Sequence, residues 1–363
     1  MTGVVALRAA GTTCGTKART LGRLLRAGLA VPDGVVVVEA AGPGWQHVLP
    51  RHLDALGADT FAVRSSSVAE DGAGASYAGQ LRTVLHVPPA EVEDAVRSVA
   101  GATAVSYEAA LGLATGGGVA VLVQPMLAPV AAGVAFTRDP VTGAVTTVVE
   151  AVTGLGEPLV SGGADPERWR VEPGGGARVD RARGVLTVGT AAAVAAHAEH
   201  VERLLGGPQD VEWAVDAAGT VWTLQARPVT ARPGTRPLVG SDPAGAPEGA
   251  LLGAGVPAGP GTARGRVRVL RSIDDLAWFL PGEVLVCRAT SPAWTPALAR
   301  AAAVVTEVGG LLSHAAIVAR ELGVPAVTGV PGAHDLPGGA LVSVDGSAGT
   351  VRLVGTARPE AAS

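Results

Sequence analysis

The sequence predicts a mixed α/β protein of two domains, and three observations lead to this fold class. The chain has 363 residues, which is long for one domain. Short valine-rich runs alternate with alanine-rich segments of helical period. Residues 230–250 are dense in Pro, Gly and Ala without periodicity, as in a fairly stiff linker. We therefore expect domains at 1–230 and 252–356, a hinge linker at 231–251 and a disordered tail at 357–363.

Composition narrows the class of protein further. Hydrophobic residues make up 48% of the chain and aromatic residues 3%, so the cores must be built from Val, Leu and Ala. No apolar run reaches the ~18 residues of a membrane span, and the first residues lack a signal-peptide pattern. Cys14 and Cys287 lie far apart, without metal-ligand spacing. With a net charge of −4 and no basic block, we expect a cytoplasmic protein that binds neither nucleic acid nor membranes.

The first domain is predicted to alternate between helices and strands. A glycine loop leads into a helix at about 17–27, and a strand follows at 35–38 after a turn at 32–34. Residues 39–60 form a short connection containing Pro and Gly. The further elements are two strands around a polar loop over 61–87, a helix in 89–116, strands in 118–127, 132–140, 146–152 and 167–173, and a helix at 190–206. The last is a hairpin over 209–229 with its turn at Asp216–Gly219.

The second domain contains a strand–helix–strand unit with a histidine at the start of its helix. We expect the strand at Ala303–Val308 and the helix from Ser313 to about Leu322. Ser313 can cap the helix and Gly323 can end it. His314 then lies on the first turn, where the helix dipole and the N–H groups favour a neutral, nucleophilic imidazole and also suit a phosphate.

Other interpretations of His314 stay open. A lone histidine at a helix start is more often a capping or packing residue. A metal site is less favoured, because no second His, Cys, Asp or Glu lies at ligand spacing. Gly309 and Gly310 precede the histidine and remove side chains that would block an approaching phosphate. This arrangement favours a phosphoryl carrier.

Candidate phosphate and metal ligands are spread through the first domain. Lys17 is the single lysine of the chain; it is either a chance survivor on a surface helix or a compact charge that arginine cannot replace. Arg64 ends a strand and suits bidentate phosphate contact, and the small-residue loop 70–80 could cover phosphates with its N–H groups. Glu212 and Gln225 would meet across the predicted hairpin, where carboxylate and amide oxygens suit Mg²⁺ with ATP.

Several motifs then occur in the order known from one superfamily. The most specific is "TSPAWTPALARAAAVVTEVGGLLSHAAIVARELGVPAVTG", and the earlier ones are "GTKARTLGRLLRAGLAVPDGVVV", "VRSSSVAEDGAGASYAGQ", "VLVQPML", "AGVAFTRDPVTG", "GLGEPLVSG" and "QDVEWAVDAAGTVWTLQARPVT". The chain resembles, over nearly its whole length, the superfamily of pyruvate phosphate dikinase, phosphoenolpyruvate synthase and rifampicin phosphotransferase. The resemblance implies an ATP-grasp-like nucleotide-binding domain followed by a small swivelling β/β/α phosphohistidine domain.

The resemblance also implies an activity, cofactors and residue roles. ATP, with Mg²⁺, would give its β-phosphoryl group to His314, leaving AMP and inorganic phosphate, and the mobile domain would carry the group to an acceptor. The other roles are implied in the same way: Lys17, Arg64 and Arg227 contact ATP phosphates, Gln124 lines the nucleotide site, and Glu212 and Gln225 hold Mg²⁺.

The chain departs from the family pattern in ways that bear on the acceptor. The region between Val38 and Phe61 is short, the opening reads Gly-Thr-Lys in place of Gly-Gly-Lys, and no segment resembles an acceptor-binding domain. We expect a small-molecule acceptor, such as an antibiotic or metabolite hydroxyl, or a separate acceptor-binding protein in trans. One alternative is a phosphoenolpyruvate synthase-like or dikinase-like subunit whose pyruvate-binding domain is a separate chain. Another is a non-catalytic nucleotide-binding subunit. The sequence predicts no oligomeric state.

Overall fold

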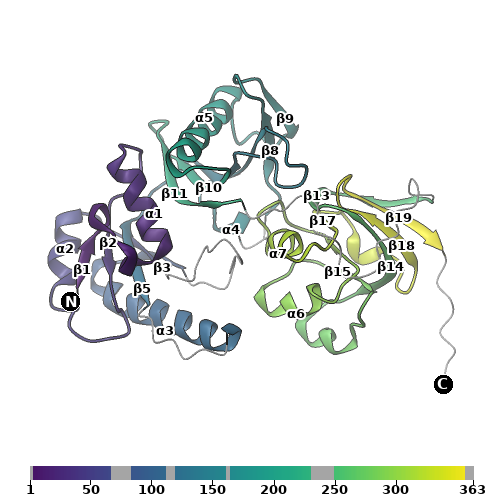
Figure 1. Ribbon diagram of the computed structural model, residues 1–363, viewed down its shortest axis with the longest axis horizontal. Helices are drawn as coiled ribbons and strands as arrows, with labels where there is room; N and C mark the ends of the chain where they lie inside the picture. Colours follow the sequence, from purple (N-terminus) through teal and green to yellow (C-terminus); the bar gives the residue numbers. More distant parts are fainter. Residues whose placement is uncertain (1–2, 67–82, 112–118, 161–163, 230–248, 356–363) are drawn as a thin grey trace. The chain divides into compact units, whose positions relative to one another are not determined.

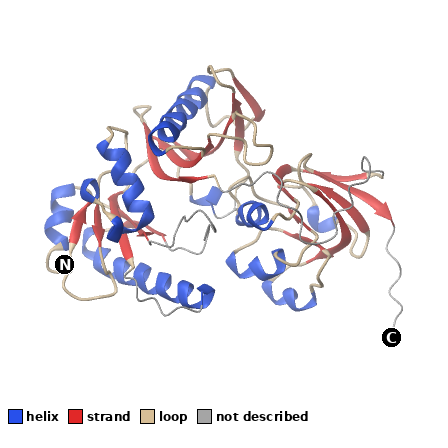
Figure 2. Ribbon diagram, in the orientation of Figure 1, coloured by secondary structure: helices blue, strands red, loops and turns tan. Residues whose placement is uncertain are grey.

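The chain forms two compact units, each of which mixes helices and strands (Figures 1 and 2). The computed structural model describes residues 3–66, 83–111, 119–160, 164–229 and 249–355. Unit 1 comprises Met1–Thr137, Thr153–Leu155 and Thr187–Val229. Unit 2 comprises Arg138–Val152, Gly156–Leu186 and Thr230–Ser363.

Unit 1 is built around a five-stranded antiparallel sheet in the order β1-β2-β5-β3-β4. Its elements are β1 (Val4–Ala6), η1 (Leu7–Ala9), η2 (Thr12–Cys14), α1 (Gly15–Arg26), β2 (Val35–Val37), α2 (Leu49–Leu56), β3 (Phe61–Ser66), β4 (Thr83–Val87), η3 (Pro89–Glu91), α3 (Val92–Leu111) and β5 (Ala120–Pro125). Phe61 and Val63 pack with Trp45 in the core on one face of this sheet. Because side chains alternate along a strand, Arg64 of β3 belongs to the opposite face.

Helix α2 lies within the segment 39–60, which the sequence indicated only as a connection. Pro50 occupies the first turn, where its missing N–H is not needed. Leu49 and Leu53 are buried in the core, and Gly57 ends the helix in the left-handed conformation, with φ 60°. Two helical turns carry too few apolar repeats to be recognised from periodicity.

A hairpin completes unit 1, at the position that the sequence predicts. Its strands are β10 (Gln209–Val215) and β11 (Val221–Pro228); β10 also pairs with β6 (Ala131–Phe136), and α5 (Val188–Leu205) packs against all three. At the turn, Oδ1 of Asp216 accepts the N–H groups of Ala218 and Thr220, each at 2.9 Å. Gly219 adopts φ 82°, a conformation that glycine takes without strain.

Unit 2 contains one antiparallel ladder and one larger mixed sheet. The ladder has the order β7-β8-β9, with β7 (Thr147–Thr153), β8 (Glu167–Val171) and β9 (Ala177–Arg181), and α4 (Glu157–Val160) lies between β7 and β8 in sequence. The larger sheet has eight strands in the order β12-β19-β18-β14-β15-β16-β17-β13. Strands β14, β15, β16 and β17 run parallel to one another, and the other pairings are antiparallel.

Both faces of the eight-stranded sheet are covered. Its elements are β12 (Leu251–Ala254), β13 (Val256–Gly259), β14 (Thr262–Val269), η4 (Ile273–Trp278), β15 (Val284–Cys287), η5 (Pro292–Trp294), α6 (Thr295–Leu298), β16 (Ala303–Thr306), α7 (His314–Leu322), β17 (Ala326–Thr328), η6 (Ala333–Asp335), β18 (Leu341–Asp345) and β19 (Thr350–Gly355). Leu285 and Cys287 of β15 pack in a core with residues of α6 and α7. Val284 and Val286 pack in the core on the opposite face. A strand buried on both sides explains the continuous apolar run "VLVC".

The predicted domain boundaries stay a prediction. The strands β7, β8 and β9, which we assigned to the first domain, belong to the same compact unit as the histidine-bearing sheet. The predicted loop 70–80, the hinge as far as residue 248, and the tail 357–363 lie outside the described residues.

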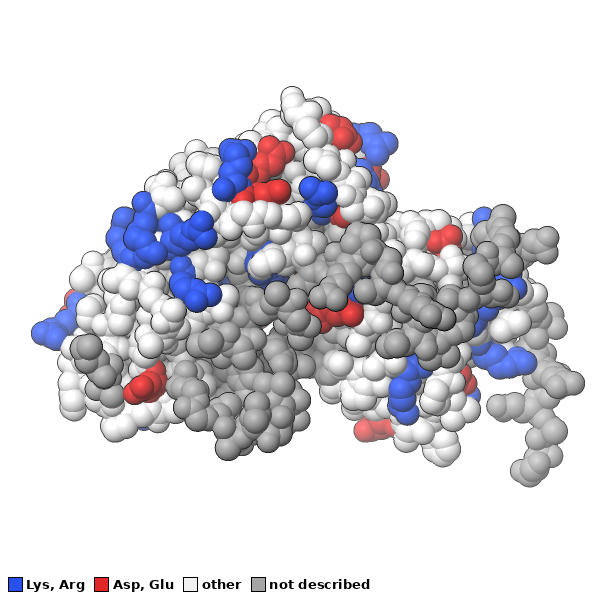
Figure 3. Space-filling view, viewed as in Figure 1, with Lys and Arg blue, Asp and Glu red and all other residues white. Residues whose placement is uncertain are grey.

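Charged side chains of both signs are interspersed among uncharged residues on the face shown in Figure 3. This agrees with a composition of 28 Lys plus Arg against 32 Asp plus Glu. Among the helices that the structure describes, none has the length and hydropathy that crossing a membrane requires.

Candidate functional site

His314 is the first residue of helix α7, as the sequence predicts. Oγ of Ser313 caps the helix by accepting the N–H of Ala316 at 3.3 Å, which satisfies one of the free donors of the first turn. Gly323 ends the helix with φ 68°. The histidine is therefore held at a defined helix start, beside N–H groups that have no partner further up the helix.

The imidazole of His314 is neutral and is held between two hydroxyl groups. Nδ1 lies 2.9 Å from Oγ1 of Thr290, and Nε2 lies 3.3 Å from Oγ1 of Thr295. Burial lowers the pKa of His314 from 6.5 to about 4, because a protonated ring would lose its hydration. The sequence predicted a neutral ring from the helix dipole, whereas the structure shows burial as the cause. A neutral imidazole keeps one nitrogen lone pair for nucleophilic attack.

The two threonines distinguish the ring nitrogens. Thr290 is itself buried and makes the shorter contact, while Thr295 is half-buried and makes the longer one. This geometry favours Nδ1 as the positioned nitrogen and Nε2 as the reacting one. Sequence reasoning missed both threonines, because Thr290 lies in the loop after β15 and Thr295 begins the short helix α6, and neither has a pattern that points toward His314.

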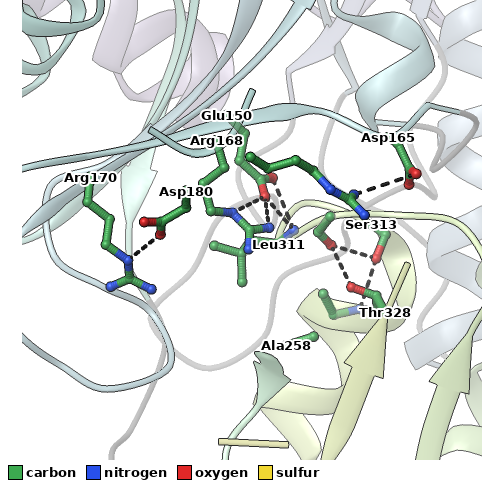
Figure 4. Close-up of polar contacts among 12 residues, drawn as sticks. Glu150, Asp165, Arg168, Arg170, Asp180, Ala258, Leu311, Ser313 and Thr328 are labelled. Carbon is green, nitrogen blue, oxygen red and sulfur yellow. Dashed lines mark hydrogen bonds and ion pairs between the residues drawn. The ribbon is translucent and has the colours of Figure 1, made fainter. Parts of the chain in front are cut away.

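The loop before His314 is held at both its N–H and C=O groups (Figure 4). The carbonyl of Gly310 accepts the hydroxyl of Ser313 at 2.9 Å. The N–H of Leu311 donates to the carboxylate of Glu150, and its carbonyl accepts Nη2 of Arg320 at 2.7 Å. Glu150 comes from β7, so a residue far away in sequence contributes to the position of this loop.

In unit 1, Arg64 is brought together with Glu212 and Gln225. Glu212 and Gln225 are direct cross-strand partners, as predicted from the hairpin. Nη2 of Arg64 lies 3.1 Å from Oε2 of Glu212 and 3.1 Å from Oε1 of Gln225. The carboxylate and amide oxygens therefore converge on one positive charge.

These two oxygens fit a divalent cation of the Mg²⁺ type. Mg²⁺ is commonly held by one or two protein oxygens and completes its shell with phosphate and water. Within the described parts of the chain, no three His, Cys, Asp or Glu side chains gather as metal ligands. A metal at Glu212 and Gln225 would therefore depend on a bound nucleotide for further oxygens.

Lys17 lies at the start of α1, against the end of the strand that carries Arg64. Its side chain is buried, and Nζ donates to the carbonyl of Ser65 at 2.9 Å. The approach requires Gly15, where a Cβ would lie 2.2 Å from the carbonyl oxygen of Ser66 and φ is 77°. The buried position argues against the interpretation of Lys17 as a chance surface residue.

Gln124 lies on β5, in the sheet that also carries Arg64. It pairs with Ala62, two residues from Arg64, so both side chains belong to one face. Nε2 of Gln124 donates to the carbonyl of Pro32 at 2.6 Å. The amide therefore anchors the turn before β2, a contact that the sequence did not indicate.

Arg227 is ion-paired with Asp210, its cross-strand partner. Nε of Arg227 lies 2.9 Å from Oδ2 of Asp210. Sequence reasoning missed Asp210, although Asp-x-Glu on one strand faces Gln-x-Arg on the next. That alternating pattern places four polar groups on one face of the hairpin.

The chain matches two protein-family descriptions, one for each predicted domain. Residues 46–182 and 177–238 match "Pyruvate phosphate dikinase, AMP/ATP-binding domain", and together they make up more than half of the chain. Residues 279–349 match "PEP-utilising enzyme, mobile domain". The chain therefore belongs to the pyruvate phosphate dikinase family of phosphotransferases. The predicted family, the fold class of a nucleotide-binding domain followed by a mobile domain, and the expectation of an enzyme with ATP and Mg²⁺ as cofactors are confirmed at this level.

Curated relatives agree with this assignment. The chain is 36% identical over 326 residues to a probable phosphoenolpyruvate synthase of Archaeoglobus fulgidus, covering 80% of this chain and 43% of that protein. It is 36% identical over 332 residues to the phosphoenolpyruvate synthase of Pyrococcus furiosus, covering 80% and 40%. For the Pseudomonas aeruginosa enzyme the identity is 32% over 316 residues, covering 74% and 40%. The chain thus spans less than half the length of these relatives.

Solved structures resemble the chain more distantly. The D-alanine-D-alanine ligase of Coxiella burnetii matches with a TM-score of 0.35 and 14% identity, covering 60% of this chain and 48% of that one. An Enzyme I protein matches with a TM-score of 0.20 and 34% identity, covering 22% and 34%. Similarities of this size carry no argument about function.

Proposed function

We propose that this chain transfers a phosphoryl group from ATP to His314 and then to an acceptor. The observation that carries the proposal is the buried, neutral imidazole at the start of α7, with Thr290 on Nδ1. Membership of the dikinase family supports it, because an AMP/ATP-binding domain and a PEP-utiliser mobile domain occur in one chain. The convergence of Arg64 with Glu212 and Gln225 supports nucleotide binding in unit 1.

The proposed roles of the residues follow from their chemistry. The lone pair on Nε2 of His314 forms a bond to the β-phosphorus as the bond between that phosphorus and the oxygen of AMP breaks, which leaves the β- and γ-phosphoryl groups on the ring. One water then cleaves the β–γ bond and releases the γ-group as inorganic phosphate, so that the ring keeps the β-phosphoryl group. Lys17 and Arg64 bind phosphate oxygens, and Glu212 and Gln225 would hold Mg²⁺, which neutralises phosphate charge when bound.

For the acceptor, we propose pyruvate. The relatives described above are named phosphoenolpyruvate synthases, which supports pyruvate ahead of the antibiotic or metabolite hydroxyl that the sequence first suggested. The proposal includes the case, expected from the sequence, in which a separate protein supplies the pyruvate site.

Labelling with ATP carrying ³²P at the β-position tests the first step. The wild-type chain should acquire acid-labile, base-stable label and release AMP. His314→Gln should abolish the label, while His334→Gln, a matched change in the same sheet domain, should retain it. Label that persists in His314→Gln would remove His314 from this role. ATP binding without label or AMP in the wild type would support the non-catalytic alternative.

A chase experiment tests the acceptor. Labelled wild-type chain is freed of nucleotide and mixed with pyruvate, or with hydroxyl-bearing compounds, in the presence and absence of cell extract. The proposal expects label to move to phosphoenolpyruvate in at least the arm with extract. Transfer to a hydroxyl compound with none to pyruvate would contradict pyruvate but leave the phosphohistidine step intact.

A further inference from the structure

Glu150 is a buried carboxylate that the proposed phosphoryl transfer does not use. It lies on β7, has 0% of its surface exposed, and stands directly opposite Arg168 on β8. Nε of Arg168 lies 3.0 Å from Oε1 of Glu150, and Nη2 binds the same oxygen. Because the two residues are cross-strand neighbours, the β7–β8 ladder holds this ion pair in place by itself.

The histidine loop, defined as Gly309–Leu311, lies on this ion pair (Figure 4). The N–H of Leu311 donates to both carboxylate oxygens of Glu150, with N···O distances of 3.0 and 3.2 Å. The carbonyl of the same residue accepts Nη2 of Arg320, a residue of α7. Leu311 thus connects the Glu150 carboxylate to the helix that begins with His314.

The contact depends on a missing side chain at Gly310. A Cβ there would lie 2.7 and 2.9 Å from the Glu150 oxygens and 2.9 Å from Cγ of Pro166, which is closer than real Cβ atoms approach. From sequence, the glycine pair was interpreted as clearing the path to His314. In the structure, the missing side chain of Gly310 allows the loop to approach the carboxylate of Glu150.

A second, looser contact lies next to the loop. Gly329, which follows β17, lies near the carbonyl of Gly309, and its Cβ would come within 3.6 Å of Oδ1 of Asp165 and 3.7 Å of Nη1 of Arg181. Arg181 and Asp165 are themselves ion-paired at 3.5 Å. Gly310 thus lies against the Glu150–Arg168 ion pair, and Gly329 lies near the Asp165–Arg181 ion pair.

We propose that the Glu150–Arg168 pair is a docking site for the histidine loop and holds it as a reversible latch. For the loop to leave, the Leu311–Glu150 hydrogen bonds must break, and the carboxylate left behind is exposed to water while still paired with Arg168. The latch can therefore open without leaving an unpaired buried charge, which would be the costly outcome. Glu150 is a positioning residue that acts through Leu311, and the proposal does not depend on the identity of the acceptor.

Hydrogen exchange of the Leu311 amide in the full chain tests the latch. Gly310→Ala removes the docking by steric exclusion, because the added Cβ would clash with the Glu150 carboxylate, and it retains both residues of the ion pair. We expect its Leu311 amide to exchange at least about tenfold faster than in the wild type, as for loss of a hydrogen bond to a charged group. The matched control is Gly338→Ala, at a glycine whose added Cβ would meet nothing within 4 Å. Amides of the central strand β14 report whether each variant is folded.

A second variant changes the hydrogen-bond acceptor, Glu150, and keeps Gly310. Glu150→Gln retains one oxygen at this position but loses the charge, so the Leu311 amide should exchange faster than in the wild type and slower than in Gly310→Ala. Wild-type protection of Leu311 in a folded Gly310→Ala chain would overturn the proposal. Equal acceleration in Gly338→Ala would overturn it as well, because the effect would then be independent of docking.

Discussion

The guanidinium of Arg64 is ion-paired with the carboxylate of Glu212, with Nη2 of the arginine 3.1 Å from Oε2 of the glutamate. The same nitrogen reaches Oε1 of Gln225 at 3.1 Å. Arg64 therefore places its charge on the two oxygens that we assign to a metal ion. Two cations repel at this distance, so a metal ion held by Glu212 and Gln225 would displace the guanidinium, which could then contact a phosphate.

The first prediction concerns this competition. Without nucleotide, Arg64→Met should raise the affinity for Mn²⁺ about fivefold or more. The substitution removes a positive charge, and the repulsion between two like charges 4 Å apart in water is about 1 kcal/mol. Glu212→Gln should lower the affinity. Free Mn²⁺ is measured by its electron paramagnetic resonance signal, with Arg97→Met, at an exposed helix pair, as the control. Unchanged Mn²⁺ affinity in Arg64→Met would show that the arginine does not compete with a metal ion for these oxygens.

The second prediction concerns the pH dependence of stability. The folded pKa of His314, about 4, lies below its ordinary value of 6.5, so the unfolded chain binds this proton more tightly. The stabilising contribution is present above pH 6.5 and is lost as the pH falls toward 4. When the pH is lowered from 7 to 5, the free energy of unfolding measured in urea should fall by about 2 kcal/mol more in the wild type than in His314→Gln. Equal losses in both chains would contradict a buried neutral imidazole.

The third prediction concerns Lys17. Lys17→Met removes the ammonium, and ATP-dependent labelling of the chain should fall at least about tenfold at low ATP, as for a lost charge-assisted phosphate contact. Lys17→Arg should not restore it, because the larger, planar guanidinium would have to replace a buried Nζ that lies 2.9 Å from the carbonyl oxygen of Ser65. The measurement is the initial rate of AMP release. A fully active Lys17→Arg chain would show that charge alone is sufficient.

The fourth prediction concerns the orientation of the histidine ring. Thr290→Val keeps the shape of the side chain but removes the hydroxyl 2.9 Å from Nδ1. The rate of phosphohistidine formation should fall about 2- to 10-fold, the range for one lost hydrogen bond. Thr290→Ser should recover most of the rate, which a purely packing role would not predict. The rate is followed by quenched-flow labelling.

The hairpin of unit 1 shows what local sequence can predict. The turn residues Asp216–Gly219 predict the hairpin itself, so Glu212 and Gln225 were expected near each other. Their direct pairing also depends on a register shift between Glu212 and Trp213, which moves the partner of Glu212 by one residue. The helix at His314 was predictable for the same reason, because its cap and its terminating glycine are both encoded within a few residues.

Contacts between distant segments were not predictable in this way. Glu150 and Leu311 are 161 positions apart, and a valine-rich strand with one glutamate does not indicate which loop will cover it. Thr290 likewise reaches His314 from a loop whose path depends on the whole sheet. Helix α2 was not predicted because it is short. The hydrogen bond from Gln124 to the carbonyl of Pro32 was not predicted because it depends on tertiary packing.

The lone lysine has a practical consequence. Since Lys17 is the single lysine of the chain, reductive methylation with ¹³C-formaldehyde can place isotopic methyl groups on two amines, the α-amine and Nζ. The two are easily distinguished by their ordinary pKa values. A two-signal spectrum of the entire chain would therefore report directly on the buried ammonium beside β3, without any assignment of the backbone.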